Sequence, residues 1–122
     1  MRLTLLLSLF CVRSFAADGP DIVVFEAKQN MSHPSARIPS LLRTQKGTLL
    51  AVAEGRDKPT DQAGNDLVIS FSKDEGATWS KPRVAYEQGA DSCNNPCLVQ
   101  ETKSGRFVAA FGDGEQRALL RA

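Results

Sequence analysis

The stretch from Ser72 to Trp79 constrains the fold most, because it combines the chemistry of a tight turn with the only tryptophan of the chain. It reads Ser-x-Asp-x-Gly-x-Thr-Trp and lies between two strand-like runs, residues 67–71 and 83–86. An aspartate accepts hydrogen bonds from nearby backbone N–H groups, and a glycine allows a positive φ. The tryptophan can fix the turn to a neighbouring core by burying a large ring. The stretch therefore predicts a turn between two strands.

Short apolar runs separated by polar turns continue along the chain, and such runs are typical of strands. We predict strands over residues 22–27, 37–43, 48–53, 67–71, 83–86, 98–101 and 106–111. A helical period appears only in the tail, residues 115–122, where a short helix and a frayed end both stay open. The pattern predicts an all-β sandwich, barrel or propeller, and periodicity alone does not choose among them.

The charge balance argues against two classes of partner. Lys and Arg number 15 and Asp and Glu number 14, which gives no electrostatic basis for binding nucleic acid or an anionic membrane surface. The only histidine, His33, lies in a polar loop and is expected to be solvated. Two cysteines would need further ligands to hold a metal ion. We therefore expect no nucleic-acid partner, no metal site and no cofactor.

The first residues have the pattern of a secretory signal peptide. Arg2 precedes an apolar run over residues 3–12, which is far shorter than the roughly 20 residues that a membrane span needs. Small residues precede a cleavage site after Ala16. We predict a signal peptide over residues 1–16, a mature domain over residues 17–122, and a secreted or periplasmic protein. A buried N-terminal helix is the alternative.

Cys93 and Cys97 would remain in the mature chain. In an exported protein two cysteines can form a disulfide. The loop between these two would be small, and Pro96 limits how the chain can bend. Because spacing alone does not give the geometry, a disulfide and two reduced thiols stay equally open.

Charged residues begin or follow two of the predicted strands. Arg37-Ile38-Pro39 begins one strand, and the proline restricts the backbone so that the arginine can be held rigidly. Its planar guanidinium group suits bidentate binding of a carboxylate. Ala53-Glu54-Gly55-Arg56 closes the next strand, and Asp61 follows in a long polar loop. Asp57 is the competing loop acid, and residue types alone do not rank the protonation of the two carboxylates.

The order Arg-Ile-Pro, strand, Glu-Gly-Arg, loop aspartate, strand and Ser-x-Asp-x-Gly-x-Thr-Trp resembles the N-terminal portion of an exo-sialidase. The match runs from Arg37 to Trp79 and continues through Asn95-Pro96-Cys97. The family usually has an aromatic residue before Arg-Ile-Pro, where this chain has Ala36. The turn looks like the Asp-box of sialidase β-propellers, a structural turn away from the active site. Its matching residues are Ser72, Asp74, Gly76, Thr78 and Trp79.

The resemblance implies a role for each matching residue. Arg37 corresponds to the first arginine of the triad that grips the sialic acid carboxylate, and Arg56 to the arginine on the O4 side of the sugar. Asp61 corresponds to the general acid/base, which protonates the leaving oxygen. Asn95 corresponds to a residue lining the O4 and N-acetyl side. The implied reaction removes terminal sialic acid from glycoproteins, glycolipids or oligosaccharides with retention, through a tyrosine nucleophile.

Other parts of the family's site have no counterpart here. Two further arginines, the tyrosine nucleophile and its glutamate lie downstream in the family, and Tyr86, the only tyrosine, is expected to be a packed or edge aromatic. A propeller blade takes roughly 40–50 residues, so the chain would make about two antiparallel blades of the six that the resemblance implies. We expect an N-terminal piece that does not hydrolyse sialosides alone. A non-catalytic sialic-acid-binding module and a small complete β-domain are the alternatives.

Overall fold

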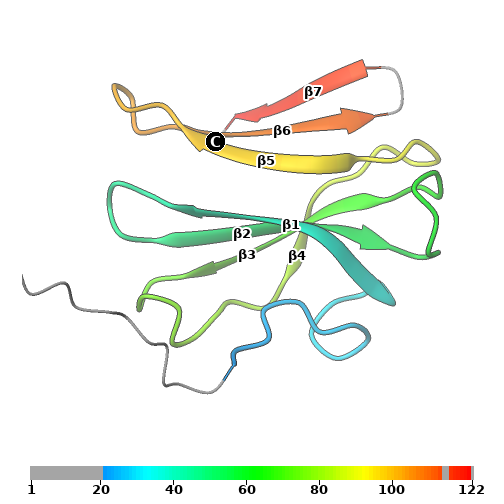
Figure 1. The fold of residues 1–122 in the computed structure, drawn as a ribbon, viewed down its shortest axis with the longest axis horizontal. Coiled ribbons are helices and arrows are strands. Elements are labelled where there is room, and N and C mark those ends of the chain that lie inside the picture. The colour runs from blue at the N-terminus through cyan, green and yellow to red at the C-terminus, as the bar shows by residue number, and fades with distance from the viewer. Residues whose placement is uncertain (1–20, 114–115, 122) are drawn as a thin grey trace, which may run out of the picture.

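The computed structural model describes residues 21–113 and 116–121. These residues form seven strands and no helix, and the strands make two antiparallel sheets (Figure 1). The first sheet has the order β1-β2-β3-β4, with bounds Ser35–Arg43, Leu49–Arg56, Asp66–Ser72 and Arg83–Tyr86. The second has the order β5-β6-β7, with bounds Asn94–Gln100, Phe107–Asp113 and Gln116–Arg121. Each sheet is therefore an up-and-down meander, as expected for propeller blades.

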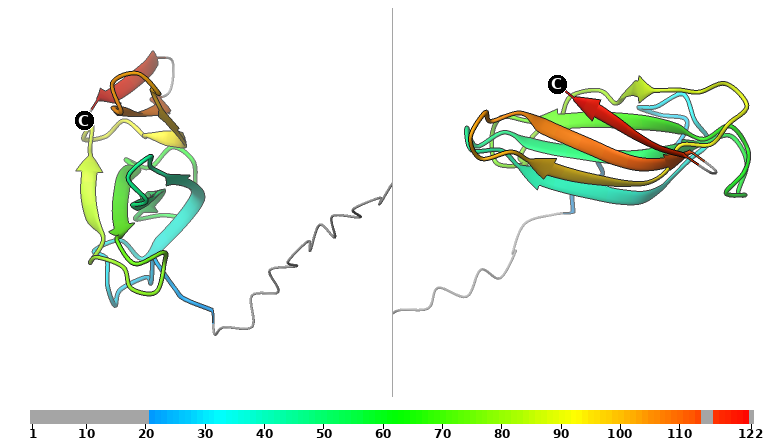
Figure 2. Two further views of the ribbon diagram at one scale, coloured as in Figure 1. Left: turned by 90° about the vertical axis from the view of Figure 1, so that its left-hand side faces the viewer. Right: turned by 90° about the horizontal axis from the view of Figure 1, so that it is seen from above.

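The main core lies between the two sheets. β5 is the strand of the second sheet nearest to the first sheet, and β7 lies farthest from it (Figures 1 and 2). Apolar side chains from β2, β3, β5 and β6 meet there with Cys93: Leu50, Val52, Leu67, Leu98, Ala109 and Phe111. The ring of Tyr86 packs on that of Phe111, with their centroids 5.0 Å apart. Tyr86 is thus a packed aromatic residue, as predicted.

β2 is covered on both faces, which explains its nearly continuous burial. Val52 faces the second sheet, whereas Ala53 joins a smaller cluster with Met31 and Val68. The segment before β1 supplies Met31 and Phe25 to that cluster, and it lies on the far side of the first sheet from β5–β7 (Figure 1). Because both faces of β2 are covered, the charged side chains at its end, Glu54 and Arg56, are held rigidly.

Two predictions of secondary structure were wrong. Residues 22–27 do not form a strand, because Asn30 binds their backbone: Glu26 N donates to Asn30 Oδ1 at 2.8 Å, and Asn30 Nδ2 donates to the Val24 carbonyl at 3.1 Å. Residues 116–121 are strand β7 rather than a helix or a frayed end. Pairing with the open edge of β6 supplies hydrogen bonds that outweigh a weak helical preference.

The cysteines lie in different environments. Cys93 is buried in the core between the sheets, whereas Cys97 is exposed on β5, and no disulfide joins them. The predicted signal peptide lies outside the residues that the structure describes. Within residues 21–113 and 116–121, no helix is long and apolar enough to cross a membrane.

Candidate functional site

A hollow of about 200 Å³ lies at the end of the sheets where β2 ends and β5 begins. It brings together the four residues that the sequence predicted for the site, Arg37, Arg56, Asp61 and Asn95. Three residues without an assigned role complete the lining: Ile38, Glu54 and Asn94. The side chains come from β1, β2, the loop after β2, and β5, so both sheets contribute.

Arg56 and Glu54 form a buried ion pair on β2. The Arg56 side chain is 2% exposed and the Glu54 side chain 0%. Nε of Arg56 donates to Glu54 Oε2 at 2.7 Å, and Nη2 donates to the same oxygen. Such a pair can be buried only when its charges are matched and hydrogen-bonded. Burial alone would lower the pKa of Arg56, but its contacts with Glu54 and Asp61 outweigh this effect and raise that pKa.

Asp61 reaches Arg56 from the loop after β2. Its Oδ1 lies 2.7 Å from Arg56 Nη1, although its side chain is 77% exposed. Of the two acids in this loop, Asp61 therefore pairs with Arg56, and the competing acid Asp57 does not.

Arg37 enters the hollow from β1, where its Cα is paired with that of Glu54. The β1–β2 register shifts between Arg37 and Ser40, and Ile38 has a φ of 50°. A positive φ is unusual for a β-branched residue, and β-bulges commonly redirect side chains next to functional sites. Arg37 is exposed and forms no ion pair within the described residues. Its charge is therefore available to a ligand.

Asn95 enters from the opposite sheet at a second bulge. The β5–β6 register shifts between Asn94 and Cys97, and Asn95 has a φ of 55°. Its backbone N–H donates to Glu54 Oε1 at 2.7 Å. Glu54 thus uses one oxygen for Arg56 and the other for β5, so it connects the two sheets. The sequence singled out Glu54 only as part of the Glu-Gly-Arg motif. What distinguishes it is that an acidic residue follows a run of apolar residues within one strand.

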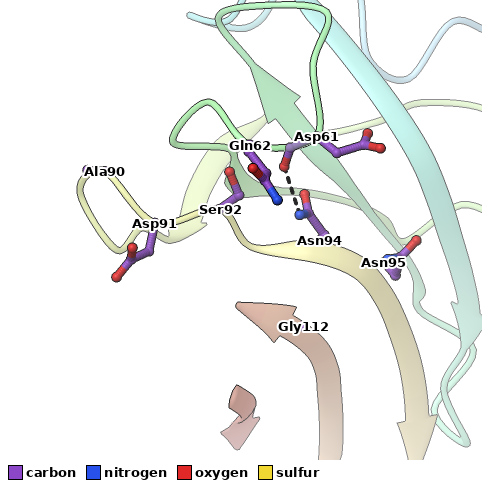
Figure 3. A pocket seen from close by; sticks show the side chains of 8 residues that line it. All are labelled: Asp61, Gln62, Ala90, Asp91, Ser92, Asn94, Asn95 and Gly112. Carbon is purple, nitrogen blue, oxygen red and sulfur yellow. Dashed lines mark hydrogen bonds between the residues drawn. The ribbon is translucent and has the colours of Figure 1, made fainter. Parts of the chain in front are cut away.

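A larger adjoining hollow of about 390 Å³ shares Asp61, Asn94 and Asn95 with the first and extends to Gly112. Figure 3 shows the Asp61 carboxylate pointing away from Gln62 and from the loop that carries Asp91 and Ser92. The carboxylate of Asp61 therefore lies at the smaller hollow, beside the two arginines, whereas its backbone faces the larger hollow.

His33 corrects one prediction, because it is buried rather than solvated. It is 5% exposed, and its Nε2 lies 3.0 Å from Asp66 Oδ2. The ring covers Gly55, where a Cβ atom would come within 2.6 Å of His33 Nδ1. This contact explains the glycine of Glu-Gly-Arg: the face of β2 opposite Glu54 and Arg56 has no room for a side chain.

The Ser72–Trp79 turn lies at the other end of the first sheet, since Ser72 pairs with Leu49 at the start of β2. Asp74 Oδ1 accepts hydrogen bonds from Ser72 Oγ at 2.7 Å and from the Thr78 N–H at 2.9 Å. The hydrogen bond from the Thr78 hydroxyl, together with those from the Thr78 N–H and from Ser72, lowers the pKa of Asp74 to about 2. Trp79 is half-buried and donates from Nε1 to the Gly76 carbonyl at 3.1 Å. The turn is closed by its own side chains and does not reach the hollow.

Two antiparallel meanders packed against each other, each in the up-and-down order of a blade, place the chain in the β-propeller class. No model of a known protein family matches the chain. A sialidase from Bacteroides fragilis is 36% identical to it over 96 residues, which cover 67% of this chain. Over the residues compared, the chain is a member of the sialidase family.

Solved sialidases share the fold. A NanB sialidase from Streptococcus pneumoniae, in complex with a substituted ethanesulfonate, matches 76% of this chain with a TM-score of 0.70 and 21% identity. A mutant of the same NanB sialidase matches 73% of the chain with a TM-score of 0.68 and 21% identity. The chain spans about a fifth of these relatives, 18% of the Bacteroides sialidase and 18% and 17% of the two NanB chains.

Proposed function

We propose that these residues form the carboxylate-binding and acid part of an exo-sialidase site. The supporting observation is the distribution of charge around the smaller hollow. Arg56 is already paired with two carboxylates, those of Glu54 and Asp61, whereas Arg37 faces the same hollow without an anionic partner among the described residues. Arg37 is therefore the arginine of this hollow whose guanidinium group is not paired with a carboxylate, and it suits a ligand that carries one.

The chemistry of sialic acid gives each residue a task. Its carboxylate lies on the anomeric carbon, next to the charge that develops in the oxocarbenium-like transition state. Arg37 would hold that carboxylate and orient the ring. Arg56 would lie on the O4 side of the sugar, and Asn95 would line the same side. Asp61, exposed at the rim, would protonate the leaving oxygen.

The complete reaction needs groups that these residues do not supply. A sialidase uses a tyrosine nucleophile, and Tyr86 is committed to the core through Phe111. We therefore propose that the 122-residue polypeptide binds sialic acid weakly and does not hydrolyse sialosides. The substrates of the complete enzyme would be sialylated glycans, cleaved with retention, outside the cell or in the periplasm after removal of residues 1–16.

Equilibrium binding of N-acetylneuraminic acid to the purified chain, followed by NMR, tests the proposal. Arg37→Ala should weaken binding by about 10- to 100-fold, because a charged hydrogen bond contributes roughly 1.5–3 kcal/mol. Arg43→Ala is the matched control: Arg43 lies on the same strand, and its exposed partner is Glu75. Equal affinities for the two variants would refute the assignment.

A fluorogenic sialoside provides the second test. We expect no turnover by the chain alone. Turnover that disappears in Asp61→Ala would contradict the proposed inactivity while supporting the role of the acid.

A further inference from the structure

We propose that Asn94 is a positioning residue for Asp61, acting through the backbone of the acid. This inference rests on the proposed function, since it assigns Asn94 to the general acid of that site. Asn94 comes from β5, in the other sheet, and lines both hollows beside Asp61.

The carbonyl oxygen of Asp61 is held by two side-chain amides. Asn94 Nδ2 donates to it at 2.9 Å, and Asn65 Nδ2 donates to it at 3.1 Å (Figure 3 draws the first bond). Asn65 Nδ2 also donates to Asn94 Oδ1 at 2.9 Å. The three groups therefore form a closed triangle in which Asn94 accepts one hydrogen bond and donates another.

Further bonds fix this triangle to the protein. Ser92 Oγ accepts from the N–H groups of Ala63 and Asn65 at 3.0 and 3.4 Å. The Asn65 carbonyl accepts from the Cys93 N–H at 2.8 Å. Asn65 is 0% exposed and Ser92 is 7% exposed, so these bonds form in a region of low dielectric, where hydrogen bonds are stronger than in water. These hydrogen bonds hold the segment just before β5 against the loop between β2 and β3.

The Asp61 side chain has little to position it otherwise. It is 77% exposed, and among the residues that the structure describes its one ion pair is with Arg56 Nη1. The carboxylate of an exposed acid on a long polar loop has a defined position only if the backbone of that acid is held in place. The amide at position 94 suits this task, because it both accepts from Asn65 and donates to Asp61. A carboxylate there would lose the donor, and a methyl group would lose both the donor and the acceptor.

The spectroscopic signature of Arg56 tests the proposal without any ligand. The ¹H–¹⁵N signals of its guanidinium group report whether the Asp61 carboxylate is in place. Asp61→Asn, which removes that negative charge, defines the displacement of the signals when the ion pair is lost. Asn94→Ala should shift the Arg56 signals by most of the amount seen in Asp61→Asn. Asn94→Asp, which keeps the shape and the acceptor but loses the donor, should shift them by a similar amount. Gln62→Ala is the matched control, because Gln62 is exposed on the same loop and lines the same larger hollow.

A double variant separates positioning from a general structural role. If Asn94 acts through Asp61, Asn94→Ala should add no further displacement in the Asp61→Asn background. Arg56 signals at wild-type positions in both Asn94 variants would overturn the proposal, and so would additive displacements. Unfolding of both variants, read from the amide signals of the core, would overturn it as well. Failure of the chain to bind sialic acid would instead contradict the proposed function and leave these signals unaffected.

Discussion

At the scale of single residues, the site depends on charges placed inside an otherwise apolar strand. Glu54 is fully buried and bonds to both Arg56 and the backbone of Asn95. Its burial is favourable only because each oxygen has a donor. A change at this one residue should therefore affect the stability of the chain as well as the shape of the hollow.

Glu54→Gln should destabilise the chain by about 3 kcal/mol, because it leaves Arg56 buried with only the exposed Asp61 as a counter-charge. Denaturant unfolding followed by tryptophan fluorescence measures the change. Glu75→Gln is the control: its pair with Arg43 is 82% and 65% exposed, and its loss should cost no more than about 0.5 kcal/mol. Similar losses in both variants would mean that the buried pair contributes no more than a surface pair.

Gly55→Ala should destabilise the chain by about 1–3 kcal/mol, because its Cβ atom would meet the His33 ring at 2.6 Å. Most of this loss should disappear in the His33→Ala background, where the ring is absent. Gly112→Ala, whose nearest neighbour would be the Asn94 carbonyl oxygen at 3.8 Å, should have little effect. Thermal unfolding of Gly55→Ala, His33→Ala and their double variant, with Gly112→Ala as the control, gives the coupling energy between Gly55 and His33. A coupling energy of zero would show that the His33 ring can move aside.

At the scale of elements, local pattern predicted the strands that lie between clear turns. β2, β3 and β4 agree with the predicted residues 48–53, 67–71 and 83–86 within a few positions. Residues 22–27 failed to form a strand because of the local hydrogen bonds of Asn30, whereas the differences in the C-terminal half arose where a distant partner decides the structure. β5 starts at Asn94 because a bulge there pairs it with Gly112, and residues 116–121 become a strand because β6 offers its edge.

The site was predictable to a similar extent. The resemblance to exo-sialidases indicated Arg37, Arg56, Asp61 and Asn95, all of which line the same hollow. Asn94, His33 and the link from Glu54 to the second sheet were missed because the partners involved are distant in sequence. The bond from Asn94 to Asp61 spans 33 residues, and that from Asn95 to Glu54 spans 41. No local period carries such information, since it depends on how the second sheet packs on the first.

The Ser72–Trp79 turn makes a pH-dependent contribution to stability. Folding lowers the pKa of Asp74 from its usual 3.8 to about 2, so the ionised carboxylate is favoured in the folded state. The contribution is fully present above about pH 4 and is lost as the pH falls toward 2. Asp74→Asn should flatten the decline of stability between pH 4 and pH 2, and Thr78→Val, which removes one donor, should flatten it partly. Unchanged declines in urea titrations of both variants would contradict this account.

At the scale of the whole molecule, two meanders leave strand edges without partners among the described residues. β1 and β4 are the outer strands of the first sheet, and β5 and β7 those of the second. β5 is covered in part by the first sheet, but Val99 on β5 is 52% exposed and Leu41 on β1 is 65% exposed. Open edges with exposed apolar side chains are a template for pairing with other chains.

The isolated 122-residue chain should therefore self-associate as its concentration rises, and sedimentation velocity measures this. Val99→Lys should shift the association to higher concentration, because a charge beside an open edge opposes pairing. Thr102→Lys is the matched control: it adds the same charge on an exposed loop residue outside the strands. A strictly monomeric chain with one cooperative unfolding transition would instead favour a small complete β-domain, because unpaired blades lack the neighbours that would bury their outer faces. The same result would weaken the proposal that the arginine-lined hollow belongs to a larger ring.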